Sequence, residues 1–253
     1  MGVHEQSCRL GRCELLPLMR QERLRARYKA ATPGYHTSGE LYEALLRRHC
    51  KPDSRILDAG CGQAGIVARA RGQARAAGID ITFAGFRDAV DLSDLVCGDL
   101  EHLPFADGAF TLVASSWVFE HLERPCRVFA EFARVLQPGG MLIFLTPNAN
   151  NWVTLANRLA PSRLQKGLVR ALYGREEVFT FRTYYRANTR AALDRYLTAA
   201  GFACAELHCA GDPTYLAFGE LGYRLGVLLE RLTDRGGLRE LKVHWVGAYV
   251  RRA

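Results

Sequence analysis

A glycine-rich turn near residue 60 constrains the fold of this chain more than any other feature of its sequence. An apolar run at residues 55–59 leads into Gly60, Gly62 and Gly65, and an Ala/Arg-rich stretch at 66–77 follows. Glycines let the backbone turn tightly and approach a ligand closely, and the N–H groups at the start of a helix are donors for an anion. The pattern predicts a strand, a ligand-binding turn and a helix.

Short apolar runs recur after this turn, and helical patterns separate most of them. Before the fifth run, an i, i+3/i+4 apolar stripe over 128–136 leads to Pro138-Gly139-Gly140, where we expect the helix to end. Alternating strands and helices require right-handed crossovers, and these give a parallel sheet covered on both faces. The first five strands are predicted at residues 55–59, 78–81, 94–97, 110–114 and 141–145.

The second half of the chain departs from this rhythm. A basic amphipathic stretch at 155–173 and a polar-aromatic loop at 179–186 indicate an insertion. Later patterns predict a helix, a strand, an amphipathic helix and a final strand, at residues 188–200, 202–208, 215–232 and 241–250. We expect the last two strands to pair antiparallel, so the fold class is α/β: a doubly wound, mostly parallel seven-stranded sheet with an antiparallel final hairpin and helical insertions.

Four regions follow from these patterns. The first is an N-terminal helical cap, whose last helix begins with capping-box spacing from Thr37 to Glu40 and runs to about Cys50. It is followed by the ligand-binding core, by the insertion, which we interpret as a substrate lid, and by the C-terminal completion of the core. Their predicted bounds are 1–50, 51–147, 148–187 and 188–253, with a helical insertion near 211–238.

The positive charge of the chain is unevenly distributed. Of a net charge of +8, the part from 151 to 253 carries 16 Lys/Arg against 9 Asp/Glu, whereas residues 1–150 carry 18 against 17. This bias suits an anionic acceptor, a phosphate-bearing carrier or a membrane surface, and a solvated Arg-rich face explains it equally well. The amphipathic stretches at 155–173 and 215–232 fit an interfacial helix, a substrate lid or an oligomer contact.

The sequence contains no run of about 18 apolar residues and no signal-peptide pattern at its N-terminus, so we expect a cytoplasmic protein. Its 8 cysteines include no Cys-x-x-Cys pair and no histidine spacing of a zinc site. We therefore expect reduced thiols and no metal centre.

Acidic residues distinguish the ligands that the glycine turn could bind. The Gly-x-Gly-x-x-Gly pattern is also the dinucleotide fingerprint, which makes a nicotinamide or flavin oxidoreductase one alternative. However, Asp58 lies two residues before the first glycine, where a carboxylate opposes a pyrophosphate and suits an ammonium group. Asp80 ends the second predicted strand, where it suits ribose hydroxyls, and Asp99 follows the third, where it suits an adenine amine. Together these groups describe S-adenosylmethionine (SAM).

Four stretches resemble, in order and spacing, the motifs of class I SAM-dependent methyltransferases, with the nearest likeness to the quinone-biosynthesis-like branch called type 11. They are residues 57–62 (LDAGCG), 98–105 (GDLEHLPF), 118–122 (VFEHL) and 136–140 (LQPGG). The resemblance implies a Rossmann-like core with SAM as the cofactor. It implies that Asp58, Gly60 and Gly62 hold the methionine end of SAM, Asp80 the ribose, and Asp99 with the Leu100 backbone the adenine, with Ser115, just past the fourth strand, beside the methionine group.

His121 is the candidate catalytic residue. Methyl transfer from a sulfonium depends largely on positioning, so a general base is optional. An acceptor hydroxyl must lose its proton, however, and histidine is the side-chain type that titrates closest to neutral pH. The alternative interpretation is a histidine that packs at a helix start and binds a backbone carbonyl.

Candidate substrate-binding residues lie in the insertion. Tyr184, Tyr185 and Arg182, with Arg186 beside them, offer aromatic rings and guanidinium groups that suit a sugar or an anionic acceptor, and an ordinary half-buried loop is the alternative. Tyr35 and His36 are weaker candidates for covering the cofactor.

The sequence thus predicts a SAM-dependent methyltransferase that acts on a small-molecule, sugar or envelope-glycan, or lipid-like acceptor, with an oxygen atom as the expected target. A peripheral membrane contact is a related expectation. The alternatives are a nucleic-acid or protein methyltransferase and a NAD-type oxidoreductase. Residues 115–118 (SSWV) lack the Asp/Asn-Pro-Pro-aromatic motif of amino methylases, which argues against nucleic acid as the partner.

Overall fold

The computed structural model describes residues 19–62, 65–82, 94–152, 181–217 and 219–253. The chain divides into two compact units. The core unit comprises residues 37–150, 182–210 and 244–253, and the accessory unit comprises 1–36, 151–181 and 211–243.

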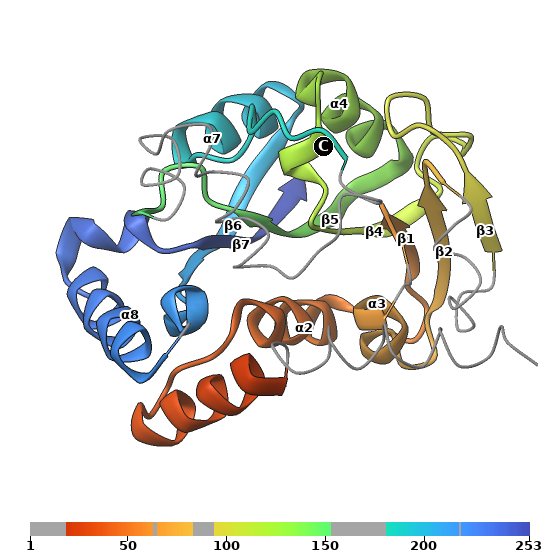
Figure 1. Cartoon of the computed structure of the whole chain (residues 1–253). Coiled ribbons are helices and arrows are strands. Elements are labelled where there is room, and N and C mark those ends of the chain that lie inside the picture. The colour runs from red at the N-terminus through yellow and green to blue at the C-terminus, as the bar shows by residue number, and fades with distance from the viewer. Residues whose placement is uncertain (1–18, 63–64, 83–93, 153–180, 218) are drawn as a thin grey trace, which may run out of the picture. The chain divides into compact units, whose positions relative to one another are not determined.

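The core unit is built on a seven-stranded sheet with the order β3-β2-β1-β4-β5-β7-β6 (Figure 1). The first five strands in this order, from β3 through β2, β1 and β4 to β5, pair parallel with their neighbours. Strand β7 pairs antiparallel with both β5 and β6. The predicted fold class is therefore confirmed, including the antiparallel hairpin at the end of the chain. The strands span Arg55–Ala59 (β1), Arg75–Asp80 (β2), Asp94–Cys97 (β3), Phe110–Ser116 (β4), Leu136–Pro147 (β5), Phe202–Ala210 (β6) and His244–Arg251 (β7).

Helices cover both faces of this sheet. Figure 1 shows α2 (Ser38–His49) and α3 (Gly65–Ala70) on one face, with α4 (Pro125–Val135) and α7 (Arg190–Ala199) on the other. The predicted apolar stripe of α4 is buried, with Phe129 and Phe132 fully enclosed against the sheet. Since each sheet face is covered, the strands bury both of their sides.

Helix α2 begins as the sequence predicts. The Thr37 hydroxyl accepts a hydrogen bond from the Glu40 N–H at 3.2 Å, and the Glu40 carboxylate accepts one from the Thr37 N–H at 3.0 Å. This reciprocal pair satisfies N–H groups that have no partner inside the helix. Tyr42, Leu45 and Leu46 are then buried against the sheet.

The helix predicted over 66–77 is wrong at its end. Helix α3 stops at Ala70, and strand β2 begins at Arg75, which pairs with Arg55 of β1. Gly72, with φ +57°, reverses the chain between the two elements. The two alanines of β2 favour helix on their own, but pairing with β1 and burial of the strand override that preference.

Other predicted boundaries also need correction. Helix α4 ends at Val135, so Pro138-Gly139-Gly140 lies inside β5 and does not end a helix. The helix predicted at 215–232 is two elements, η4 (Pro213–Leu216) and α8 (Glu220–Thr233). The final strand begins at His244, after η5 (Gly236–Leu241). The predicted amphipathic stretch at 155–173 lies outside the described residues.

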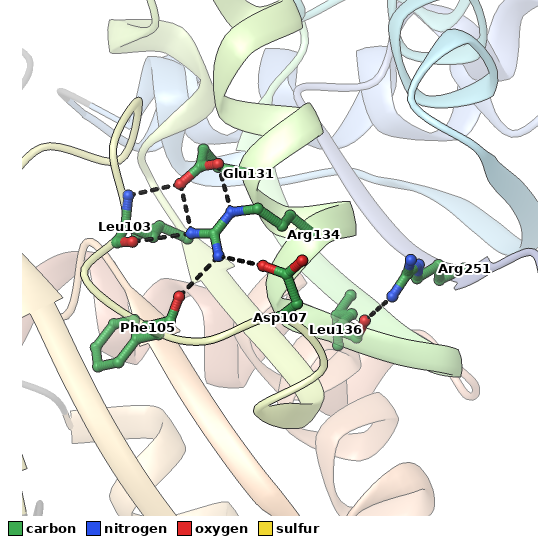
Figure 2. A network of polar contacts seen from close by, with 7 residues as sticks. All are labelled: Leu103, Phe105, Asp107, Glu131, Arg134, Leu136 and Arg251. Atoms are coloured by element: carbon green, nitrogen blue, oxygen red, sulfur yellow. Dashed lines mark hydrogen bonds and ion pairs between the residues drawn. The ribbon is translucent and has the colours of Figure 1, made fainter.

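Arg134 of α4 holds the segment that follows β3. Its guanidinium donates to the carbonyls of Leu103 and Phe105 at 2.9 and 2.7 Å, and it forms ion pairs with Asp107 and Glu131, both at 2.7 Å (Figure 2). The Glu131 carboxylate also accepts from the Leu103 N–H at 2.7 Å. Because planar guanidinium groups bind several acceptors in fixed directions, this contact set orients the loop that begins at the carboxyl end of β3.

The accessory unit is helical in the parts that the structure describes. Residues 19–31 form a helix, and Leu24 and Tyr28 from it cluster with Tyr223 of α8. Arg25 pairs with Asp212 at 2.7 Å, and Lys242 pairs with the buried Glu230 at 3.2 Å. Within the described ranges, no helix has the length and apolarity needed to cross a membrane.

Candidate active site

The glycine turn after β1 is held by the neighbouring strand β2. The N–H groups of Gly60 and Cys61 both donate to the Ile79 carbonyl, at 2.8 and 3.1 Å. Gly60 and Gly62 have φ of +77° and +45°, in the left-handed region that favours glycine. A Cβ at Gly60 would lie 2.2 Å from Val118 Cγ2, so only glycine fits here. This contact also places the turn beside Val118, which directly precedes the short helix η2 (Phe119–His121).

Asp58 is buried in β1, where the described residues give its carboxylate no hydrogen-bond partner. The residue is only 4% exposed. Burial, followed by the charge of Asp80, raises the pKa of Asp58 to about 7. A buried carboxylate that lacks donors is costly, and a cationic ligand removes that cost.

Asp80, at the end of β2, binds backbone on both of its oxygens. Its Oδ2 accepts from the Gly62 N–H at 2.9 Å, and its Oδ1 accepts from the Thr82 N–H at 3.1 Å. The side chain therefore stabilises the glycine turn directly, which sequence reasoning did not predict. Residues 83–93, which link β2 to β3, lie outside the described residues.

Asp99 and Leu100 follow β3 and open the loop that Arg134 orients. Asp99 is exposed, and its Oδ1 accepts from the Glu101 N–H at 2.9 Å. Leu100 is half-buried against the core. The register pairs Ile79 with Ala59 of β1 and Asp80 with Cys97 of β3, so the carboxyl ends of these three strands meet at one edge of the sheet. Asp58, Asp80 and Asp99 thus share that edge.

Ser115 does not lie past the fourth strand, as predicted, but inside it. Strand β4 continues to Ser116 because it pairs with β5 as far as Leu145. Ser115 is fully buried, and its hydroxyl donates to the Ala59 carbonyl at 3.0 Å. The side chain therefore ties β4 to the end of β1, immediately before the glycine turn.

His121 lies at the end of η2 with its imidazole oriented by backbone. Its Nδ1 is 3.1 Å from the Arg182 carbonyl oxygen, and its Nε2 is 3.9 Å from Glu120 Oε1. Since a carbonyl only accepts, Nδ1 must carry the hydrogen of this contact, and Nε2 is then the basic nitrogen of the neutral ring. The backbone-carbonyl contact considered as the alternative is present, and it leaves the ring in the tautomer that a base needs.

Sequence reasoning missed Glu120, a buried carboxyl next to His121. Burial raises its pKa. The Thr146 hydroxyl donates to its Oε2 at 3.2 Å, and Asn188 Nδ2 donates to the Thr146 oxygen at 2.6 Å. These three buried side chains come from η2, β5 and the segment before α7. The stretch 118–122 pointed to this place, but only packing shows that Glu120 faces inward.

The loop at 182–186 closes over η2. Its Tyr184 and Tyr185 N–H groups donate to the Glu120 carbonyl at 2.7 and 3.1 Å. The Tyr184 ring has the guanidinium groups of Arg182 and Arg186 at 5.0 and 5.4 Å from its centroid. Tyr185 has φ +52°, which is strained for a tyrosine. The structure therefore brings all three predicted substrate residues to His121. Tyr35 and His36 belong to the accessory unit, where the Tyr35 hydroxyl donates to the Gly211 carbonyl at 3.2 Å.

Trp117 is a second residue that the sequence analysis did not single out. It follows β4 directly, has φ +59° and is 43% exposed. Its backbone N–H donates to the Leu145 carbonyl at 2.9 Å. Its ring meets the His244 ring of β7 edge-on, with the two centroids 4.9 Å apart. An exposed, conformationally strained indole at the carboxyl end of a strand is a candidate acceptor contact.

Comparison with known proteins agrees with this geometry. The family described as "Methyltransferase domain" matches residues 57–144, which run from β1 into β5. The phthiotriol/phenolphthiotriol dimycocerosates methyltransferase of Mycobacterium leprae is 32% identical over 191 residues, which cover 68% of this chain and 67% of that protein. The chain belongs to the class I SAM-dependent methyltransferase family.

Other methyltransferases match shorter parts of the chain. The malonyl-[acyl-carrier protein] O-methyltransferase of Methylococcus capsulatus is 36% identical over 117 residues, covering 43% of this chain and 42% of the relative. That of Laribacter hongkongensis is 31% identical over 152 residues, half of each chain. The chain thus spans about half the length of these curated relatives or less.

Solved methyltransferases share the fold at low identity. In the complex of the Haloferax volcanii Trm112 methyltransferase activator with a putative methyltransferase, the matched chain has a TM-score of 0.58 at 18% identity, with 92% of this chain and 94% of that chain covered. Geranyl diphosphate C-methyltransferase of Streptomyces coelicolor, solved with S-adenosyl-L-homocysteine, has a TM-score of 0.55 at 16% identity, covering 83% and 78%. SAM is the cofactor of the family to which the chain belongs, so the oxidoreductase alternative is set aside.

The residues at the glycine turn fit that cofactor. SAM carries an α-ammonium group, and Asp58 is a buried carboxylate for which the described residues supply no donor. Gly60 adds no side chain to the turn, which lies against the Val118 side chain.

Replacing Gly60 by Ala should destabilise this methyltransferase by about 2–4 kcal/mol, because the left-handed backbone and the collision with Val118 add. Chemical denaturation measures the loss. Gly201→Ala is the matched control in the same unit: its φ is +87°, but no atom lies within 4 Å of its Cβ position, so about 1–2 kcal/mol is expected. Equal losses for the two variants would show that contact with Val118 is not what requires glycine at position 60.

Proposed function

We propose that this methyltransferase transfers the methyl group of SAM to an oxygen atom of a small-molecule, sugar or envelope-glycan, or lipid-like acceptor. The observation that carries the proposal is the orientation of His121. The Arg182 carbonyl contacts its Nδ1, which makes Nε2 the basic nitrogen. His121 lies three residues after Val118, whose side chain lies against the glycine turn. A base placed there serves a hydroxyl acceptor, which must lose a proton as it is methylated.

On this proposal the cofactor is held by the residues at the edge of β1, β2 and β3. The Asp58 carboxylate pairs with the ammonium group, and the backbone at Gly60 and Gly62 lies against the methionine end. Each carboxylate oxygen of Asp80 already accepts one backbone N–H, from Gly62 or Thr82, and its remaining lone pairs accept from the ribose hydroxyls. Asp99 and the Leu100 backbone bind adenine. The Ser115 hydroxyl donates to the Ala59 carbonyl, directly before the glycine turn. Ser115 thereby positions the turn beside the methionine group.

When bound, SAM supplies an activated methyl group for in-line displacement. The protein's own part is to orient the acceptor and take its proton. His121 Nε2 accepts that proton, and the ring then carries a positive charge. Glu120 lies with its Oε1 3.9 Å from Nε2, where an ionised carboxylate stabilises the charged ring. Glu120 is thus a positioning residue, held in turn by Thr146 and Asn188.

The acceptor is selected by the loop at 182–186. Arg182 and Arg186 flank the Tyr184 ring, so this loop presents two cations and an aromatic face beside His121. Such a surface suits a sugar ring that bears anionic groups, or an anionic head group of a lipid-like acceptor. The names of the relatives support these acceptor classes, since they include an O-methyltransferase of malonyl-[acyl-carrier protein] and a phthiotriol/phenolphthiotriol dimycocerosates methyltransferase.

An extract-labelling experiment tests the acceptor class. The full chain is incubated with ¹³C-methyl SAM and an extract of its host, and the products are separated into lipid, glycan, small-molecule, protein and nucleic-acid fractions. We expect enzyme-dependent label in one of the first three, with a ¹³C shift characteristic of methyl bound to oxygen. The Asp58→Asn variant is the control for background labelling. Label confined to protein or nucleic acid, or bound to nitrogen or carbon, would overturn the proposal.

A further inference from the structure

Helix α8 of the accessory unit carries a leucine stripe on its exposed side. The stripe consists of Leu221, Leu225, Leu228 and Leu232, which are between 39% and 83% exposed. At about 100° per residue, they fall within an arc of roughly 60° on the helix surface. The opposite side of α8 is buried through Tyr223, Gly226 and Glu230. The helix therefore packs into its unit with one side and presents a continuous apolar strip on the other.

Arginines border this stripe along one flank. Arg224 and Arg231 are exposed and lie roughly 60–80° from Leu221 around the helix. Arg224 pairs with Glu220, which also pairs with Arg27, so one carboxylate is shared by two guanidinium groups. Among the described residues, Arg231 forms no ion pair within 4 Å. The border of the stripe is thus positively charged.

An open groove adjoins the same flank. It has a volume of about 320 Å³, and Arg224, Leu228 and Arg231 line it together with Arg27, Tyr28 and Val227. All of these residues belong to the accessory unit. The groove combines an apolar floor with three guanidinium groups at its rim, which suits an anionic head group whose apolar part continues along the stripe.

We propose that α8 docks on a lipid bilayer that contains anionic lipids, with its leucine stripe inserted at the interface and Arg27, Arg224 and Arg231 at the head groups. Leucines bordered by arginines are the composition of an interfacial helix. The docking surface brings the protein to a membrane and does not depend on the acceptor proposed above.

A second copy of the chain is the competing occupant, since leucines spaced by four, three and four residues also suit a coiled coil. The residues that would flank such a seam argue against it. Arg224 and Arg231 occupy the equivalent flanking position of successive heptads, and the other flank holds Gly222 and Leu229. Antiparallel pairing therefore sets arginine against arginine, and parallel pairing gives neither arginine an acidic partner. Anionic lipid supplies the opposite charge that a second copy lacks.

Vesicle flotation of the full chain tests this inference. The protein is mixed with vesicles of phosphatidylcholine alone or with an equal share of phosphatidylglycerol. We expect flotation with the anionic vesicles, reduced by salt. The double variant Leu221→Gln/Leu225→Gln should bind roughly 30- to 100-fold less tightly, and Arg231→Gln roughly fivefold less. Met19→Gln, which removes another exposed apolar side chain, and Arg252→Gln, which removes one exposed charge, are the matched controls and should bind like the wild type.

Light scattering and circular dichroism distinguish the remaining outcomes. An unchanged helical signal and melting temperature show that each variant is folded. If the wild-type chain does not float, or if the leucine variants float as well as the wild type, the inference is overturned. A wild-type dimer that becomes a monomer in the leucine variants, without flotation, would assign the stripe to a second copy and would also overturn it.

Discussion

Replacing His121 by Ala is expected to lower kcat roughly 100- to 10,000-fold while leaving the Kd for SAM within about twofold. The range is that of a general base, and the cofactor is held by other residues. The assay uses labelled SAM with the acceptor fraction found in the extract experiment. Selective loss of kcat is the mark of a group that acts in the transition state and not in binding.

Three further variants separate catalysis from support. His121→Gln keeps a donor for the Arg182 carbonyl but has no basic nitrogen, so it should be as inactive as His121→Ala. His208→Ala is the matched control, because His208 lies exposed in β6 and pairs with Glu206. Wild-type turnover in His121→Gln would reduce His121 to a structural contact. Glu120→Gln should lower kcat less than His121→Ala and shift the pH at which activity appears, since the charged ring loses a neighbouring carboxylate.

Replacing Asp58 by Asn is expected to weaken SAM binding roughly 10- to 100-fold at pH 7.5, because a charge-assisted bond to the ammonium group is lost. In the wild type, the affinity itself should depend on pH. The pKa of Asp58 is raised to about 7, so the carboxylate becomes protonated below that pH and SAM binding weakens, approaching tenfold per pH unit. In the Asn variant this dependence should disappear. Titration calorimetry from pH 5.5 to 7.5 measures both effects.

Stability of the unliganded protein provides an independent readout for Asp58. A carboxyl whose pKa is higher in the folded than in the unfolded chain holds its proton more tightly in the fold. Stability therefore falls as pH rises from about 4, near the ordinary value of 3.8, to about 7. Asn carries no such charge, so Asp58→Asn should melt at or above the wild-type temperature at pH 7.5 while binding SAM less tightly. A variant with a lower melting temperature and pH-independent wild-type binding would contradict the assignment.

The local patterns of the sequence determined much of the core unit. The capping box at Thr37 and Glu40 joins residues three apart, and the turn at Gly60 and the strand Asp94–Cys97 follow local conformational preferences; each forms where predicted. The resemblance of four short motifs identified the family. Strand β2 was placed too late because its alanines favour helix until β1 pairs with them.

Tertiary structure alone decided which polar groups share a site. Glu120 contacts Thr146, 26 residues away, and Thr146 contacts Asn188, 42 residues further on, so no spacing rule connects them. Asp80 was predicted to face a ligand, but folding also makes it the acceptor that holds Gly62 in place. Likewise the periodicity of residues 215–232 showed an amphipathic helix, whereas packing decided that the leucine stripe of α8 is on its exposed side. Sequence records local preferences, and the burial of distant residues against one another is settled only when the chain is folded.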